Sequence, residues 1–226
     1  MENNSKTLAV IFDMDGVLVD SYQAHFESWR QTAQAHGLDM TEQQFAGTFG
    51  RTTREIITAL WGDHVSGDSV GLWDDQKELA YRGILDADFP AMHGAGALLA
   101  SLREAGMKLA IGSSGPPENV ELVLEHLGRD IFAGAVTARD VTHGKPHPEV
   151  FLKAAGKLRI DPINCAVVED APAGIQAARR AGMVAIALTG TAQREKLAAE
   201  AHLVVDSLDE LSPEIIDSLI SGSSRR

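Results

Sequence analysis

The sequence predicts an α/β fold: a doubly wound, Rossmann-like parallel sheet as the core, with an inserted helical segment. Short apolar segments alternate with longer amphipathic ones, which is typical of a parallel sheet covered by helices on both faces. The segments of strand length lack polar alternation, so both of their faces should be buried. The strands are expected at Thr7–Phe12, Lys108–Ile111, Asn164–Val168, Met183–Leu188 and Leu203–Val205. The helices are expected near 94–105, 117–127, 148–158, 172–181 and 192–200.

Residues 21–89 interrupt this alternation. No strand pattern is found within them, and apolar residues such as Ile56 and Leu60 fall on one helical face. The sequence therefore predicts two domains. One is an α/β core of residues 1–20 and 90–226, and the other is a small all-helical domain of residues 21–89.

The composition of the 226-residue chain excludes several classes of protein. With 44% hydrophobic residues the chain can bury an ample core, which argues against disorder as its main state. Its single cysteine, Cys165, excludes an intrachain disulfide and indicates a reducing compartment. No apolar run reaches the roughly 20 residues of a membrane-spanning helix, and the first residues lack the pattern of a secretory leader. A cytoplasmic location is expected.

The formal net charge of −12 restricts the partners. It opposes binding to nucleic acid and to anionic membranes, so neither is expected as a partner. It also repels anionic metabolites at long range. A small phosphorylated substrate would therefore require a local cluster of cations.

Two acids follow the first expected strand. Asp13 and Asp15 are separated by one residue and precede Gly16. Ligands of open parallel sheets bind beyond the carboxyl ends of strands, and two carboxylates this close repel each other unless a cation or a shared proton intervenes. Taken alone, the segment is equally compatible with a solvated turn. A calcium loop beginning at Asp13 is disfavoured because apolar residues occupy its later ligand positions, namely Val17, Val19 and Ala24.

Three later segments raise the odds of a functional site. Ser113 and Ser114 follow another expected strand and precede a helix start, where free backbone N–H groups can bind an anion. Lys145 lies in a loop between glycine and proline, and Glu169–Asp170 follow a third apolar strand. Each segment also has an ordinary interpretation, as a helix cap or as solvated charges. His143 and His147 are interpreted as loop histidines and not as a metal pair.

Together these segments resemble the motifs of the haloacid dehalogenase (HAD) superfamily, and the match covers nearly the whole chain. Asp13–Gly16 is similar to its first motif, Ser113 to its second, Lys145 to its third and Glu169–Asp170 to its fourth. The segment 169–175 is most similar to the phosphatase and β-phosphoglucomutase-like branch. In that branch, residues 21–89 would form a helical cap.

The resemblance implies a role for each motif residue. Asp13 would be the nucleophile that forms an aspartyl-phosphate, and Asp15 would be the general acid and base. Ser113 would hydrogen-bond the transferring phosphoryl group, and Lys145 would balance its charge. Gly16 and Ser114 are expected beside the substrate. The expected Mg²⁺ ligands are Asp13, the backbone carbonyl of Asp15, Asp170 and, nearby or through water, Glu169. The presence of Asp15 disfavours a dehalogenase.

The identity of the second nucleophile decides between two reactions. Attack by water makes a phosphatase, and attack by a sugar hydroxyl makes a mutase. In the predicted cap, His25, Arg54 and Lys77 resemble residues of β-phosphoglucomutase-like enzymes that face the substrate, with Arg51 as a rival to Arg54. Trp29 is expected to pack in the core.

The segment that follows Ser114 departs from the mutase pattern. Because Gly115 and two prolines stand where the mutases have polar contacts, a phosphatase of a small sugar or polyol phosphate is preferred. A phosphosugar mutase is the alternative, and a phosphosugar-binding regulator without turnover is disfavoured. A monomer or weak homo-oligomer is expected.

Overall fold

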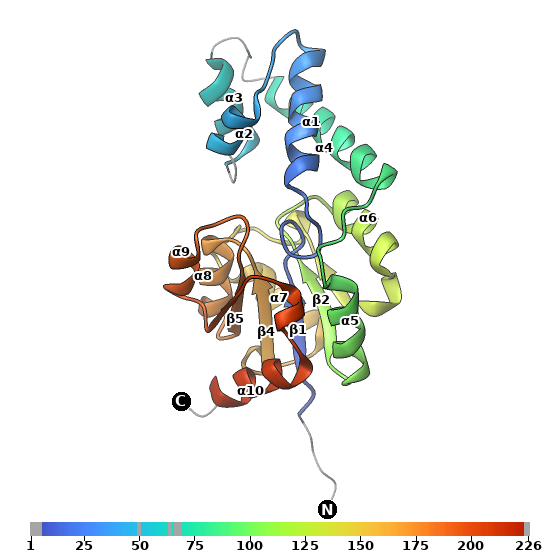
Figure 1. Ribbon diagram of the computed structural model, residues 1–226, viewed down its shortest axis with the longest axis vertical. Coiled ribbons are helices and arrows are strands. Elements are labelled where there is room, and N and C mark those ends of the chain that lie inside the picture. The colour runs from blue at the N-terminus through green and yellow to red at the C-terminus, as the bar shows by residue number, and fades with distance from the viewer. Residues whose placement is uncertain (1–5, 49–50, 63–64, 66–68, 224–226) are drawn as a thin grey trace, which may run out of the picture. The chain divides into compact units, whose positions relative to one another are not determined.

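The computed structural model describes residues 6–48, 51–62, 65 and 69–223, and the chain divides into two units. One unit comprises Met1–Asp20 and Ala91–Arg226, and the other comprises Ser21–Pro90 (Figure 1). No described helix combines the length and the hydropathy that a bilayer-spanning segment requires.

The first unit is built on a parallel sheet whose described strands have the order β3-β2-β1-β4-β5-β6. The strands are β1 (Ala9–Phe12), β2 (Lys108–Gly112), β3 (Gly134–Val136), β4 (Cys165–Glu169), β5 (Val184–Leu188) and β6 (Leu203–Val205). Successive strands are added on one side of β1 up to β3 and then on the other side from β4 onward, so the order of the strands reverses between β1 and β4. Such a switch point opens a crevice at the carboxyl ends of the strands, where ligands bind.

Helices pack on both faces of this sheet and bury the apolar side chains of its strands. They are α5 (Ala95–Glu104), α6 (Pro117–Leu127), α7 (Glu149–Leu158), α8 (Pro172–Arg180), α9 (Arg194–Ala198) and α10 (Pro213–Ser223). Alternate strand residues, such as Ala9 and Ile11 of β1, share a buried cluster with Phe151 of α7 and Ile175 of α8. Because successive side chains of a strand point to opposite faces, Val10 and its equivalents line the other face, where α5 and α10 contact β2, β4 and β5.

The fold class predicted from the sequence is confirmed. The structure adds two elements that the prediction missed, β3 and α10. Strand β3 is only three residues long and reads Gly-Ala-Val, so it carries no run of β-branched residues. Helix α10 does carry a signal, because Ser212 precedes a proline at its first position and Ile216 and Ile220 recur four residues apart.

The second unit has only helices as regular structure in its described part. They are α1 (Tyr22–Ala35), α2 (Glu42–Thr48), α3 (Thr53–Trp61) and α4 (Val70–Ala87). Their apolar faces meet in a cluster that contains Trp29, Phe45, Trp61 and Trp73, with the rings of Trp61 and Trp73 centred 5.1 Å apart. Trp29 packs in this core.

The two chain segments that lead out of the sheet unit run side by side. Val19 forms an antiparallel bridge with Ala91, and the Met92 N–H donates to the Leu18 carbonyl at 2.9 Å. The insertion therefore begins and ends at neighbouring points of the sheet unit.

Candidate active site

Buried charged side chains gather at the carboxyl edge of β1 and β4. The register pairs Phe12 with Val168, and the Asp13 N–H donates to the Val168 carbonyl at 2.9 Å. Asp13 therefore leaves β1 at the level where Glu169 ends β4. Lys145 Nζ reaches both acids, 2.6 Å from Asp13 Oδ1 and 2.8 Å from Glu169 Oε1. The strand pairing thus brings together residues that are far apart in the sequence.

The site holds more acids than its lysine can neutralise. One oxygen each of Asp13, Glu169 and Asp170 lies within 4.8 Å of the other two, and all three residues are buried. Burial raises the pKa of Asp13 to about 7, a rise that Lys145 opposes and Glu169 reinforces. Burial and the neighbouring Glu169 also raise the pKa of Asp170 well above its usual range. These raised values reflect negative charge that Lys145 does not offset and that an additional cation would neutralise.

Burial would lower the pKa of Lys145, but its two anionic partners Asp13 and Glu169 raise it overall. The ammonium therefore stays charged at neutral pH. It contacts the carboxylates of both Asp13 and Glu169, so that these buried groups are electrostatically coupled.

We expect Lys145→Met to cost about 3–5 kcal/mol of unfolding free energy, because it leaves two buried acids without their cation. Lys145 lowers the pKa of Asp13 and of Asp170, so without it the folded-state pKa values of these two acids rise further above their unfolded values. The cost should therefore be largest at alkaline pH and shrink as the acids protonate toward pH 5. Urea unfolding at the two pH values measures it.

The exposed Lys196 offers a matched control for this loss of charge. Lys196→Met should change the unfolding free energy by no more than about 0.5 kcal/mol. Equal, pH-independent costs for the two variants would show that Lys145 is not coupled to the acids.

Gly16 makes room for the acids. Its φ is +74°, in the left-handed region that glycine adopts at little cost, and a Cβ there would overlap Oδ2 of Asp170. The Thr191 hydroxyl donates to the same Asp170 oxygen. Thr191 was missed by the sequence analysis, because it lies in a loop three residues after the end of β5 and not at the strand end itself.

Glu169 is fixed through both of its carboxylate oxygens. Oε1 accepts from Lys145, and Oε2 accepts from the Ala171 N–H at 2.6 Å. A Cβ on Gly174 of α8 would overlap this side chain. Glu169 is therefore held as a fixed charge beside Asp13 and Asp170.

Asp15 and Ser113 occupy the turns next to this cluster. The N–H groups of Val17, Leu18 and Val19 all point to the Met14 carbonyl, which folds the segment after Asp13 into a tight turn. Asp15 in this turn is half-buried and contributes to the raised pKa of Asp13.

Ser113 follows β2, the other neighbour of β1. It is buried, its N–H donates to the Val136 carbonyl, and its Oγ accepts from the Gly115 N–H at 2.9 Å. The next residue, Ser114, is exposed.

The helical unit has a pocket of its own, with a volume of about 410 Å³. Two of the three cap residues that the sequence analysis singled out, His25 and Lys77, line it. Lys77 is buried, its Nζ lies 3.0 Å from His25 Nδ1, and it donates to Glu78 Oε1 at 2.7 Å. The His25 ring stacks on Tyr81 with centroids 4.2 Å apart. The pocket is therefore lined by the Lys77 ammonium, whose position is fixed by its contacts with His25 and Glu78.

Arg51 also lines this pocket, whereas the exposed Arg54 is not among the described residues that do. A capping box at the start of α3 separates the two arginines. The Thr52 side chain accepts from the Glu55 N–H, and Glu55 Oε2 accepts from the Thr52 N–H at 2.8 Å. Arg51 therefore precedes the helix, while Arg54 lies within its first turn.

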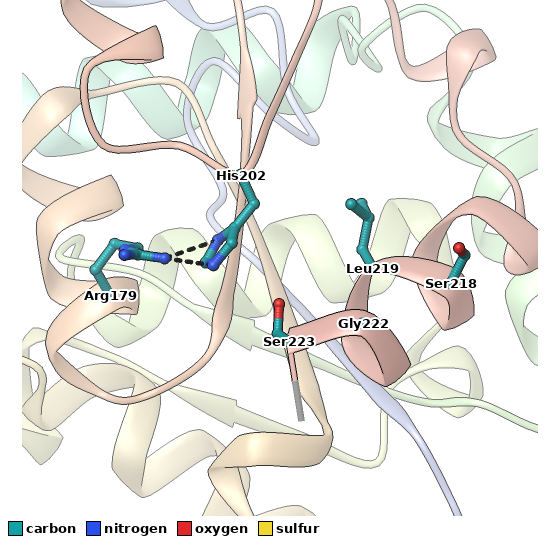
Figure 2. Close-up of a pocket in the computed structure, with 6 residues that line it drawn as sticks. All are labelled: Arg179, His202, Ser218, Leu219, Gly222 and Ser223. Carbon is teal, nitrogen blue, oxygen red and sulfur yellow. Dashed lines mark hydrogen bonds between the residues drawn. The ribbon is translucent and has the colours of Figure 1, made fainter. Parts of the chain in front are cut away.

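A larger pocket, of about 580 Å³, lies beside the amino ends of β5 and β6, away from the acidic cluster (Figure 2). Figure 2 shows the guanidinium of Arg179 directed at the ring of His202, with α10 contributing the rest of the lining. Its described lining residues are Arg179, His202, Ser218, Leu219, Gly222 and Ser223. None of them belongs to the predicted site.

Comparison with known proteins agrees with these features. A family model described as haloacid dehalogenase-like hydrolase matches residues 7–182. The chain is 34% identical to a validoxylamine A 7′-phosphate phosphatase of Streptomyces hygroscopicus, over 89% of this chain and 94% of that protein. It is 31% identical to a β-phosphoglucomutase of Bacillus subtilis, over 92% and 93%. A crystal structure of a Clostridium difficile β-phosphoglucomutase superimposes with a TM-score of 0.81 at 29% identity, covering 97% of this chain and all of that one.

Proposed function

The chain belongs to the haloacid dehalogenase-like hydrolases, and on that premise we propose that it is a Mg²⁺-dependent phosphatase of small sugar or polyol phosphates. Its membership, which the sequence motifs predicted, is confirmed. The observation that carries the proposal is the contact of Lys145 Nζ with Asp13 Oδ1 inside a cluster of buried acids. A nucleophilic carboxylate needs such a neighbouring cation to approach an anionic phosphate.

The proposed reaction has two displacements. Asp13 attacks the phosphorus, the bond from phosphorus to the ester oxygen breaks, and Asp15 gives its proton to the departing alkoxide. Asp15 then takes a proton from water as that water attacks the aspartyl-phosphate, which releases phosphate and restores Asp13. Lys145 and Ser113 hold the phosphoryl oxygens during both steps, because phosphoryl transfer depends mainly on positioning and electrostatics.

The residues fit a magnesium ion. Mg²⁺ prefers oxygen ligands, and the buried oxygens of Asp13 and Asp170 lie close together under an excess of negative charge. We assign these two side chains and the backbone carbonyl of Asp15 as its protein ligands, with Glu169 held nearby. When bound, the ion neutralises charge on the nucleophile and the phosphate and orients the phosphoryl group.

Stabilisation by Mg²⁺ should grow with pH. An unfolded aspartate has a pKa of about 4, and in the folded protein that of Asp13 is about 7. Between these values the folded state binds more protons, so this group makes the unfolding free energy fall as pH rises. A metal that competes for the same oxygens should reverse that loss. The increase in Tm on adding Mg²⁺ should therefore be larger near pH 8 than near pH 5.5.

Thermal unfolding in excess Mg²⁺ or in chelator, at matched ionic strength and at both pH values, measures this increase. An increase of the same size at both values, or none at either, would contradict the assignment of the metal to these acids.

The lining of the pocket in the helical unit favours a substrate that has a second polar group. In the pocket of Ser21–Pro90, Lys77, His25 and Arg51 supply a cationic and hydrogen-bonding lining. Lys77 and Arg51 are the local cations that a chain of net charge −12 needs to bind an anion. We propose that this unit acts as a cap that selects the substrate. The names of the relatives, a validoxylamine A 7′-phosphate phosphatase and a β-phosphoglucomutase, favour phosphorylated carbohydrates as the substrate class.

Arg51→Ala should raise KM by about tenfold, the effect of losing one charge-assisted contact worth roughly 1.5 kcal/mol. Arg54→Ala is the matched control, and its KM should stay near the wild-type value. Steady-state kinetics on one phosphorylated sugar compares them. A larger increase in KM for Arg54→Ala than for Arg51→Ala would instead assign the substrate contact to Arg54.

The assay that tests the function follows two products. Purified protein is incubated with a panel of sugar and polyol phosphates, in Mg²⁺ or chelator, while free phosphate and isomerised sugar phosphate are measured. Phosphate release without isomerisation supports the phosphatase. Conversion of β-glucose 1-phosphate to glucose 6-phosphate, stimulated by the bisphosphate, would establish the mutase instead.

The mutase remains the second candidate, because His25 lines the cap pocket within reach of Lys77 and the chain has β-phosphoglucomutase relatives. In a mutase, His25→Ala should increase the share of aspartyl-phosphate lost to water, since a cap pocket that holds the sugar less well delays attack by its hydroxyl. In a phosphatase all of the aspartyl-phosphate is hydrolysed by water, so this share cannot change.

A further inference from the structure

A second group of metal-binding side chains lies outside the acidic cluster. Two histidines and a glutamate, His143, His147 and Glu149, each present one ligand atom within 4.8 Å of the other two. They lie on the loop that carries Lys145 and at the start of α7. We propose that they form a site for a transition-metal dication of the Zn²⁺ class, separate from the proposed Mg²⁺ site.

The fold positions these side chains without a metal. The His147 N–H donates to the Gly144 carbonyl at 3.0 Å, and this turn brings His147 back toward His143, with their rings centred 4.6 Å apart. Glu149 accepts from the backbone N–H groups of Thr142 and His143 at 3.1 and 3.0 Å. The first helical residue of α7 therefore anchors the loop, so little ordering is needed when an ion binds.

The spacing of the ligand atoms suits a tetrahedral ion. His143 Nδ1 lies 3.2 Å from Glu149 Oε2. Two ligand atoms that each lie about 2.0 Å from a tetrahedral zinc ion are separated by about 3.3 Å. An ion could replace the direct contact between this nitrogen and oxygen with little movement of either. Oε1 can keep its ion pair with Lys153, at 2.8 Å.

The chemistry of the ligands distinguishes this site from the acidic cluster. Imidazole nitrogens select zinc, copper and nickel, whereas clustered carboxylates suit magnesium. The His143 side chain is 63% exposed, so an ion can reach the site from solvent, and three protein ligands leave a fourth position for water. The sequence alone favoured ordinary loop histidines because it does not place Glu149 beside them.

Zinc titration of the full chain in excess Mg²⁺ tests the proposal, with binding measured by calorimetry and ¹⁵N chemical shifts of the histidine rings measured by NMR. We expect one zinc per chain, with shifts at His143 and His147. His143→Ala and His147→Ala, made separately, should each weaken binding by about tenfold or more. His126→Ala, at an exposed histidine of α6, should bind zinc as the wild type does.

Three results would overturn the proposal: no zinc binding in excess Mg²⁺, equal binding by the His143, His147 and His126 variants, or ring shifts confined to other histidines. Thermal unfolding without zinc checks that each variant is folded. Because binding is measured without substrate, these outcomes are independent of whether the protein is a phosphatase or a mutase.

Discussion

Asp13→Asn is expected to reduce kcat by at least about 10⁴-fold, the size of loss seen when a covalent nucleophile is removed. The amide is a poor nucleophile and carries no charge for Lys145 Nζ, which lies 2.6 Å from Asp13 Oδ1 in the wild type. The variant should remain folded, because it removes a carboxylate whose pKa is raised by burial. Single-turnover phosphate release in Mg²⁺ measures the loss.

Asp161→Asn is a matched control, since Asp161 is exposed and has no part in the cluster. It should turn over at the wild-type rate. Turnover by Asp13→Asn at a rate close to that of the control would exclude Asp13 as the nucleophile and with it the proposed two-step route.

Asp15→Asn is expected to slow hydrolysis of a sugar phosphate by about 10²–10⁴-fold, the usual contribution of a general acid and base. The alkoxide of a sugar leaves poorly without a proton. With p-nitrophenyl phosphate, whose leaving group is stable as an anion, the first displacement should be nearly unaffected. The second still needs a base, so aspartyl-phosphate should accumulate.

Rapid quenching followed by intact-mass measurement detects that intermediate as one added phosphoryl group on the chain. Equal losses for both substrates with no accumulation would argue that Asp15 positions other groups and transfers no proton.

The arrangement of the sheet explains how much of the site could be predicted from the sequence. Asp13 and Glu169 each end an apolar strand, and parallel pairing places such ends at one edge. Their proximity therefore follows from the pattern, and so does the fold class. Lys145 is different, because it lies in a loop whose path no periodicity specifies. Its position at the acids was expected only from the family resemblance.

Other features depend on contacts that sequence patterns do not show. Thr191 donates to Asp170 from a loop after β5, and a lone threonine in a loop carries no signal of its partner. Arg51, not Arg54, lines the cap pocket because the Thr52 capping box starts α3 between them. Threonine followed three residues later by glutamate is a recognisable helix start, so the sequence shows the helix boundary between the two arginines but not which of them lines the pocket.

The bridge between Val19 and Ala91 means that the helical insertion leaves and re-enters the sheet unit through two neighbouring chain segments. An insertion with neighbouring ends can be lengthened, shortened or exchanged without shifting the register of β1 against β2 or β4. In evolution or protein engineering, a different helical insertion can therefore replace this one at the junction, while the residues of the acidic cluster stay unchanged.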